Sequence, residues 1–122
     1  MSDIFISNAA SLVGDDHVIQ KSPTHNSGGS TDMGDLSQIM PVIHPYTGVA
    51  TGTGHGDDYL VQDYTQGVVN PAKALAATIV DLLCREDNPA NKILSEFQPD
   101  YSIKSYLKLQ RSRLIEEVYK PK

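Results

Sequence analysis

The chain has 122 residues, the usual size of one domain. Its net charge of −5 and pI of about 5.1 argue against a nucleic-acid-binding surface, which needs a basic patch. Its one cysteine, Cys84, excludes an internal disulfide, fits a reducing compartment and is expected to be a buried packing thiol. Without a run of eighteen apolar residues or a basic signal region, the chain is predicted to be cytoplasmic, with no membrane partner.

The first elements in chain order are a helix and two short strand candidates. Apolar side chains recur at helical spacing over residues 3–13, with Ser2 as a cap before them and Gly14 as a stop after them. Residues 17–19 and 42–44 are short apolar segments typical of strands. The pattern therefore predicts one short amphipathic helix and two brief strands.

Two loops and a short helix are predicted around these strands. Residues 22–31 are rich in Ser, Gly, Pro and Asn and predict a loop. A short helix is expected over residues 32–40, because Pro41 ends it. Residues 48–58 contain four glycines and predict a tight loop of functional character.

The second half of the chain predicts three helices. Asn70 followed by proline is a strong helix start, and residues 72–84 are apolar on nearly every side. Asn88 followed by proline opens a second helix that ends near Phe97. A long terminal helix is expected from Ser102 toward Tyr119, with an apolar and a charged side.

These elements predict an α/β protein with few strands, an α+β arrangement being the other possibility. Two or three short strands make a poor sheet alone. The helix over residues 72–84 needs partners on several sides, and the other predicted elements do not supply them. The sequence therefore indicates a chain that is part of something larger.

One cluster of side chains points to metal chemistry. His55 stands between Gly54 and Gly56, so its backbone is free to aim the imidazole into a cleft, and Asp57 and Asp58 follow directly. Imidazole is the commonest protein ligand for zinc, and carboxylates complete such sites. The alternative is a solvated glycine-rich turn with surface acids.

A second glycine-rich stretch covers residues 28–37. Glycines before a helix can bind an anion through backbone N–H groups, but Asp32 and Asp35 would repel a phosphate there. An Asp- and Ser-rich helix cap is therefore favoured. His44, between Ile43 and a proline, is expected to be a hydrogen-bonded core residue rather than a ligand.

Three stretches together carry a resemblance: Gly-Ser-Thr-Asp-Met-Gly-Asp-Leu-Ser-Gln-Ile-Met-Pro-Val-Ile-His ending at His44, Gly-Thr-Gly-His-Gly ending at Gly56, and the Ala-rich helix after Asn70. Over residues 5–85 the chain resembles the C-terminal part of the zinc amidohydrolases of the aminoacylase/carboxypeptidase group of metallopeptidases. The branch containing the aminobenzoyl-glutamate hydrolase subunit is the most similar. The resemblance implies a division into residues 1–87, the C-terminal part of a three-layer catalytic domain, and residues 88–122, a helical tail.

In that family two divalent metals, usually zinc, polarise an amide carbonyl and activate water. By motif position, His55 is expected to be the last metal ligand and Asp32 the acidic residue that supports the site. The expected site wall comprises Asp32, Asp35, His44, Asp57 and Asp58. The family's upstream Cys and His ligands, its Glu-Glu pair and its inserted dimerisation domain have no counterpart here.

The resemblance therefore implies a partial enzyme. The complete protein would hydrolyse an amide bond of an N-acyl amino acid or a short peptide-like substrate, with the missing upstream chain or a complementary subunit supplying the other ligands. General-base catalysis lacks its base in this chain, so the chain alone is expected to be inactive and to bind metal weakly. Two other hypotheses stand beside this one: a non-catalytic interaction module or gene remnant that folds with a partner, and a small domain whose glycine loops bind an anion.

Overall fold

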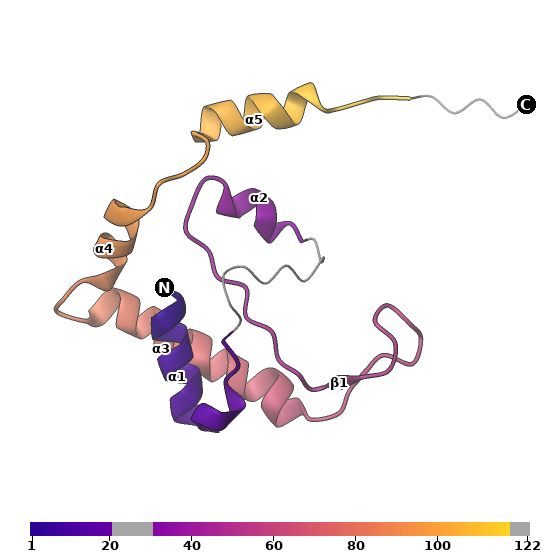
Figure 1. Ribbon diagram of the computed structural model, residues 1–122, viewed down its shortest axis with the longest axis vertical. Coiled ribbons are helices and arrows are strands. Elements are labelled where there is room, and N and C mark those ends of the chain that lie inside the picture. The colour runs from indigo at the N-terminus through magenta and orange to yellow at the C-terminus, as the bar shows by residue number, and fades with distance from the viewer. Residues whose placement is uncertain (21–30, 118–122) are drawn as a thin grey trace, which may run out of the picture.

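The computed structural model describes residues 1–20 and 31–117, and this part of the chain is mostly helical with one antiparallel hairpin (Figure 1). Its five α-helices are α1 (Ser2–Val13), α2 (Met33–Ser37), α3 (Asn70–Cys84), α4 (Pro89–Glu96) and α5 (Ile103–Ser112). The hairpin consists of β1 (Ala50–Thr51) and β2 (Leu60–Val61), with Ala50 paired to Val61 and Thr51 to Leu60. There are also two short helical turns. η1 (Asp15–His17) follows α1, and η2 (Thr65–Val69) leads directly into α3.

The most tightly packed contact is between α1 and α3, which lie side by side (Figure 1). Ala74 and Thr78, four residues apart on α3, are 2% and 3% exposed. The amide of Asn8 on α1 donates hydrogen bonds to Asp81 Oδ2 at 2.8 Å and to Thr78 Oγ1 at 3.4 Å. The small core of the described chain therefore lies between these two helices.

Helix α3 begins earlier than its sequence signal suggests. The π-helical turn η2 runs directly into α3, and Asn70 has helical dihedral angles instead of acting as a cap. Asp63 performs the capping, because its side chain accepts a hydrogen bond from the backbone of Gln66 at 3.0 Å and its carbonyl accepts one from Gly67. The helical run thus extends over Thr65–Cys84.

The two predicted strands are wrong. Residues 15–17 form a 3-10 turn, and residues 18–20 and 41–49 lie outside any regular element. Strands form instead at the borders of the glycine-rich loop, where each strand finds the other as its partner. A short apolar segment becomes a strand only where another backbone can pair with it, and local sequence does not contain that information.

Helix ends agree with local signals in some places and not in others. Gly14 ends α1 with a φ of 89°, and the Asn88 side chain caps α4 by accepting from Asn91 N at 3.4 Å, as predicted. Ser2 lies inside α1 and makes no cap. Helix α2 is shorter than its predicted 32–40 range, and α5 ends at Ser112 although its pattern continues toward Tyr119. Most of the predicted loop at 22–31 lies outside the described residues.

The chain is open. It exposes 10,239 Å², whereas a folded monomer of 13.3 kDa exposes roughly 6,400 Å². Cys84 is exposed, so the expectation of a buried thiol is wrong. By length and composition alone the run Thr65–Cys84 could cross a membrane, and only 11% of it is buried. The apolar surface of α3 away from α1 is therefore uncovered by the described residues.

Candidate functional site

The glycine-rich loop that carries His55 is the tip of the β1–β2 hairpin. Thr53 N donates to Asp58 Oδ1 at 3.0 Å, and Gly56 N donates to Thr53 O at 2.7 Å, so the tip is closed by its own turns. Gly52 has a φ of 89°, and a Cβ there would clash with the carbonyl of Asp58 across the hairpin. Only glycine fits this position, and the tip itself therefore requires glycine at residue 52.

His55 occupies a rare backbone conformation at this tip. Its φ is 66°, in the left-handed region that a side-chain-bearing residue enters at a cost of about 1–2 kcal/mol. The residue is exposed. Such conformations gather at functional sites, and the direction of inference runs from the observed geometry to a functional hypothesis. The imidazole is thus presented outward from a closed turn.

The nearby carboxylates do not form a donor set with this imidazole. Asp58 is engaged by the backbone of Thr53, and Asp63 caps η2. Asp57 is exposed on the same tip. No group of three or more His, Cys, Asp or Glu side chains able to hold a metal ion occurs within residues 1–20 and 31–117.

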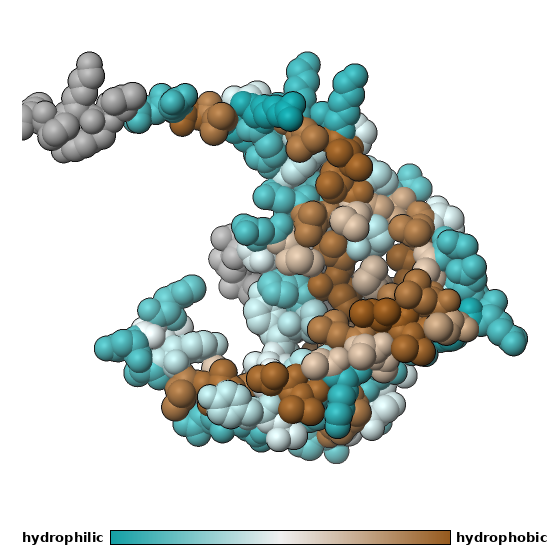
Figure 2. Space-filling view, turned by 180° about the vertical axis from the view of Figure 1, so that it is seen from behind, coloured by the Kyte–Doolittle hydropathy of each residue, from teal (hydrophilic) through white to brown (hydrophobic). Residues whose placement is uncertain are grey.

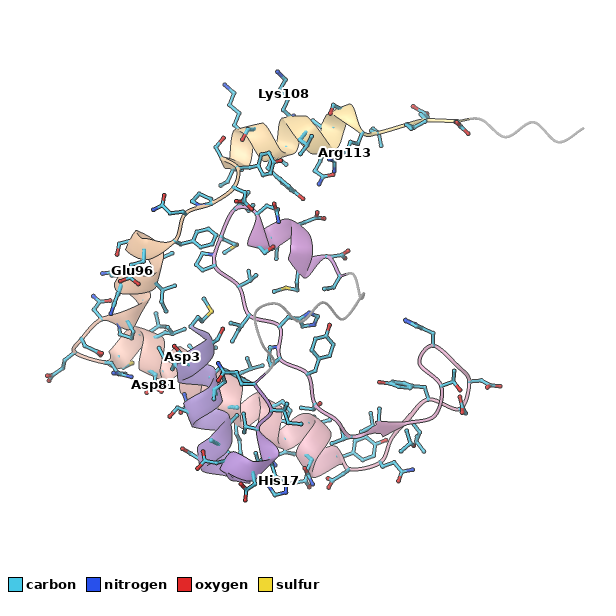
Figure 3. All side chains as sticks on the ribbon, in the orientation of Figure 1. Asp3, His17, Asp81, Glu96, Lys108 and Arg113 are labelled. Atoms are coloured by element: carbon cyan, nitrogen blue, oxygen red, sulfur yellow. The ribbon has the colours of Figure 1, made fainter. Side chains whose placement is uncertain are left out.

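Asp35 belongs to a different place, the contact between α2 and α5. It accepts a hydrogen bond from the hydroxyl of Tyr106, which also receives one from Gln110 Nε2 at 2.6 Å. The pKa of Tyr106 is raised, mainly by the hydrogen bond to Asp35 and secondly by burial of the hydroxyl. Arg113, directly after α5, lies on the side that faces α2, and Lys108 on α5 points away from α2 (Figure 3).

This contact holds the C-terminal helix against the stretch that contains Asp32 and Asp35. Tyr101 N adds a backbone hydrogen bond to Gln38 O at 3.2 Å. Asp32 is exposed at the start of α2, and its side chain makes no capping hydrogen bond. Sequence reasoning missed Tyr106 and Gln110, because neither belongs to a motif and their partner is about seventy residues away.

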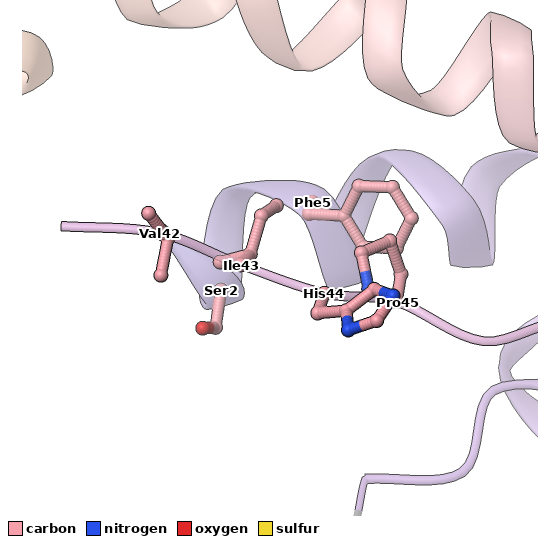
Figure 4. Close-up of a pocket in the computed structure, with 6 residues that line it drawn as sticks. All are labelled: Ser2, Phe5, Val42, Ile43, His44 and Pro45. Carbon is pink, nitrogen blue, oxygen red and sulfur yellow. The ribbon is translucent and has the colours of Figure 1, made fainter. Parts of the chain in front are cut away.

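His44 lies in a third place, a shallow groove of about 310 Å³ between α1 and the extended segment after α2 (Figure 4). The groove is lined by Ser2, Phe5, Val42, Ile43, His44 and Pro45. The His44 ring is exposed and stacks at a tilt on Tyr46, with centroids 4.7 Å apart. It is therefore a surface residue and not the core histidine that the sequence predicted.

The structure thus places the predicted site residues in three separate groups. The tip brings His55, Asp57 and Asp58 together, α2 carries Asp32 and Asp35, and His44 stands apart. No family model matches the chain, and no curated protein or solved structure matches it either. A functional interpretation therefore depends on the residues and their geometry.

Proposed function

We propose that this chain is the C-terminal part of the catalytic domain of a metal-dependent amidohydrolase, in which His55 supplies the last metal ligand. The observation that carries the proposal is the backbone of His55, held at a φ of 66° on the exposed tip of a closed hairpin. A left-handed backbone is uncommon for a residue that carries a side chain, and here it occurs on an exposed tip. This geometry is suitable for presenting one imidazole to a centre formed elsewhere.

The described residues do not by themselves fit a metal site. Catalytic zinc usually has three protein ligands, and among the described residues no group of three or more His, Cys, Asp or Glu side chains could hold a metal ion around His55. The proposal therefore assigns the remaining ligands and the general base to additional polypeptide, either an upstream part of the domain or a complementary subunit. On its own the chain binds zinc weakly and hydrolyses nothing.

The open architecture supports the need for additional polypeptide. The chain exposes roughly 3,800 Å² more than a closed monomer of its mass. Within the described residues the segment 41–48 lies in no strand, and β1 and β2 have only two residues each. A sheet contributed by another part of the enzyme would give these backbones partners.

The first test measures the purified 122-residue chain in the presence of zinc. An N-acetyl amino acid serves as the amide substrate, and isothermal titration calorimetry follows metal binding. We expect no turnover, and weak zinc binding that His55→Ala removes and His17→Ala retains. Turnover by the chain alone that His55→Ala abolishes would contradict the partial-enzyme proposal, and so would zinc binding unaffected by His55→Ala.

The second test supplies the missing part. An adjacent reading frame that encodes Cys-Gly-His and Glu-Glu segments would be co-expressed with this chain. We expect zinc-dependent amide hydrolysis that is lost in His55→Ala, with His17→Ala as the matched control. Activity that survives His55→Ala would show that the hairpin tip contributes no ligand.

A second candidate function is a non-catalytic interaction module that folds with a partner chain. The uncovered apolar surface of α3 favours it, because that surface requires a partner whether or not a metal is bound. The absence of a neighbouring frame with the Cys-Gly-His and Glu-Glu segments would favour this module over the split enzyme. In that case the chain is expected to bind its partner equally well with His55→Ala.

A further inference from the structure

Residues 52–59, at the tip of the hairpin, hold their shape through bonds to one another. The tip projects from the rest of the described chain with a mostly hydrophilic surface (Figure 2). Gly56 N donates a hydrogen bond to Thr53 O at 2.7 Å, and Tyr59 N donates one to Gly56 O at 3.4 Å. Among the described residues, the groups that keep His55 in its left-handed conformation therefore belong to the tip itself.

One side chain closes the tip around His55. The Oδ1 atom of Asp58 accepts a hydrogen bond from Thr53 N at 3.0 Å. Residues 54–57 lie between the two bonded residues, so this bond closes a ring that contains His55. A carboxylate is a stronger acceptor for a backbone N–H group than a neutral oxygen is. The side chain of Asp58 is therefore in a position to fix the backbone on both sides of His55.

Two glycines of the tip leave room for Asp58. A Cβ at Gly56 would lie 2.6 Å from Asp58 Oδ1 and 3.0 Å from Thr53 Cβ. A Cβ at Gly52 would clash with the backbone carbonyl of Asp58. At Gly54, in contrast, a Cβ would meet nothing within 4 Å. The close fit around Asp58 indicates that its carboxylate is part of the turn and not an incidental surface charge.

We propose that Asp58 is the positioning residue of His55, which it holds in the left-handed conformation through its bond to Thr53 N. The inference rests on the proposed function, in which His55 is the residue that acts. It gives Asp58 a different role from the one that the sequence predicted, because this carboxylate is engaged by the backbone. Asp57 is equally exposed and carries the same charge, but the bond to Thr53 N is made by Asp58. The two neighbouring acids thus have different roles.

One hydrogen bond of this kind is large enough to matter for the backbone of His55. The left-handed region is disfavoured by about 5- to 30-fold for a residue that carries a Cβ. Removing a side-chain oxygen that accepts from an exposed backbone N–H group typically shifts a local equilibrium by about 5-fold. The bond from Thr53 N to Asp58 therefore offsets a substantial part of the cost of the left-handed conformation.

Nuclear magnetic resonance of the metal-free 122-residue chain tests the proposal. The NOE between the amide proton and the Hα of His55 is strongest at positive φ, because the two protons are then closest. In Asp58→Ala we expect the ratio of left-handed to other conformers to fall by about 5-fold, with a weaker NOE and unchanged amide shifts in α3. Asp58→Asn should restore the NOE, because the asparagine oxygen accepts the same bond. The matched control, Asp57→Ala, removes the same charge and should leave the NOE unchanged.

A second variant tests the same arrangement without changing any charge. In Gly56→Ala the new Cβ displaces the carboxylate of Asp58, so the NOE of His55 should weaken as it does in Asp58→Ala. Combining the two substitutions should cause little further loss, because both remove one interaction. The proposal is overturned by an unchanged NOE in Asp58→Ala, by an equal loss in Asp57→Ala, or by a failure of Asp58→Asn to restore the NOE.

This experiment separates the role of Asp58 from the proposed metal function, because it is carried out without zinc. If the NOE depends on Asp58 while zinc binding survives His55→Ala, the positioning role stands and the metal-ligand role of His55 fails. If zinc binding is lost in His55→Ala while Asp58→Ala leaves the NOE unchanged, the metal-ligand role stands and the positioning role of Asp58 fails.

Discussion

The α1–α3 pair and the β1–β2 hairpin are stabilised in opposite ways. Between the helices, Ala74 and Thr78 are buried, and an amide–carboxylate hydrogen bond links Asn8 to Asp81. The hairpin has two-residue strands and a largely exposed tip, and its shape comes from turn hydrogen bonds and from Gly52. One region is held by side-chain packing and the other by local backbone geometry.

The difference has a consequence for function. The candidate ligand His55 is placed on the region with little packing around it, whereas the packed region carries no candidate ligand. A side chain on an exposed hairpin is aimed precisely enough for chemistry only when neighbouring structure holds it. In the proposed enzyme, additional polypeptide would therefore have to hold the hairpin tip in place.

The largest expected effect is at the centre of the packed region. Ala74→Asp would bury a carboxylate against α1 and should destabilise the chain by about 3–5 kcal/mol, comparable with the whole stability of a small domain. Urea unfolding followed by far-UV circular dichroism measures this loss. Lys73→Asp, an exposed neighbour on the same helix, serves as the control and should cost far less.

A smaller and local effect is expected in the hairpin. Gly52→Ala forces a Cβ into the left-handed region and against the carbonyl of Asp58, which should cost about 2 kcal/mol and open the tip. Amide chemical shifts of the hairpin should change while those of α3 stay the same. Gly54→Ala is the control, because a Cβ there meets nothing within 4 Å. Unfolding of α3 by Gly52→Ala would show that the two regions are one cooperative unit.

Removal of the polar link between α1 and α3 should have a modest effect. Asn8→Ala deletes the hydrogen bond to Asp81 and leaves that half-buried carboxylate without this donor, at an expected cost of about 1 kcal/mol. The midpoint of urea unfolding should fall, and Ser11→Ala on the exposed side of α1 should leave it unchanged. An equal loss in both variants would attribute the effect to helix propensity instead.

The smallest effect concerns the α2–α5 contact at high pH. Because the hydrogen bond to Asp35 raises the pKa of Tyr106, the contact is present below the ordinary tyrosine pKa of about 10 and is lost as the pH rises through the raised value. Ultraviolet titration of tyrosinate should show one late-titrating group that Tyr106→Phe removes. Tyr59→Phe on the hairpin should retain it.

Several features of the fold follow from short-range signals. Gly14 stops α1, Asn88 caps α4, and Ser102 caps α5 by accepting from Ser105 N at 3.1 Å. The glycine-rich composition of residues 48–58 likewise predicted a tight loop, in which position 52 requires glycine. Each of these depends on groups within a few residues of one another, so the sequence pattern contains the cause.

The features that the sequence missed depend on distant partners. Residues 42–44 have the composition of a strand but pair with no backbone among the residues that the structure describes, and the acceptor of Tyr106 is Asp35 on another helix. For the candidate site, sequence reasoning identified His55 and its flanking glycines but grouped them with Asp32, Asp35 and His44, which the fold separates. Proximity across tens of residues is set by packing and not by spacing.

The sequence by itself determined which segments are helical, where several of them end, and that the helix of residues 72–84 is apolar on nearly every side. Only the tertiary structure decided that α1 covers one side of that helix and that the described residues leave its other side exposed. The physical reason is that hydrophobicity is a property of each residue, whereas burial is a property of the surface that another element brings against it.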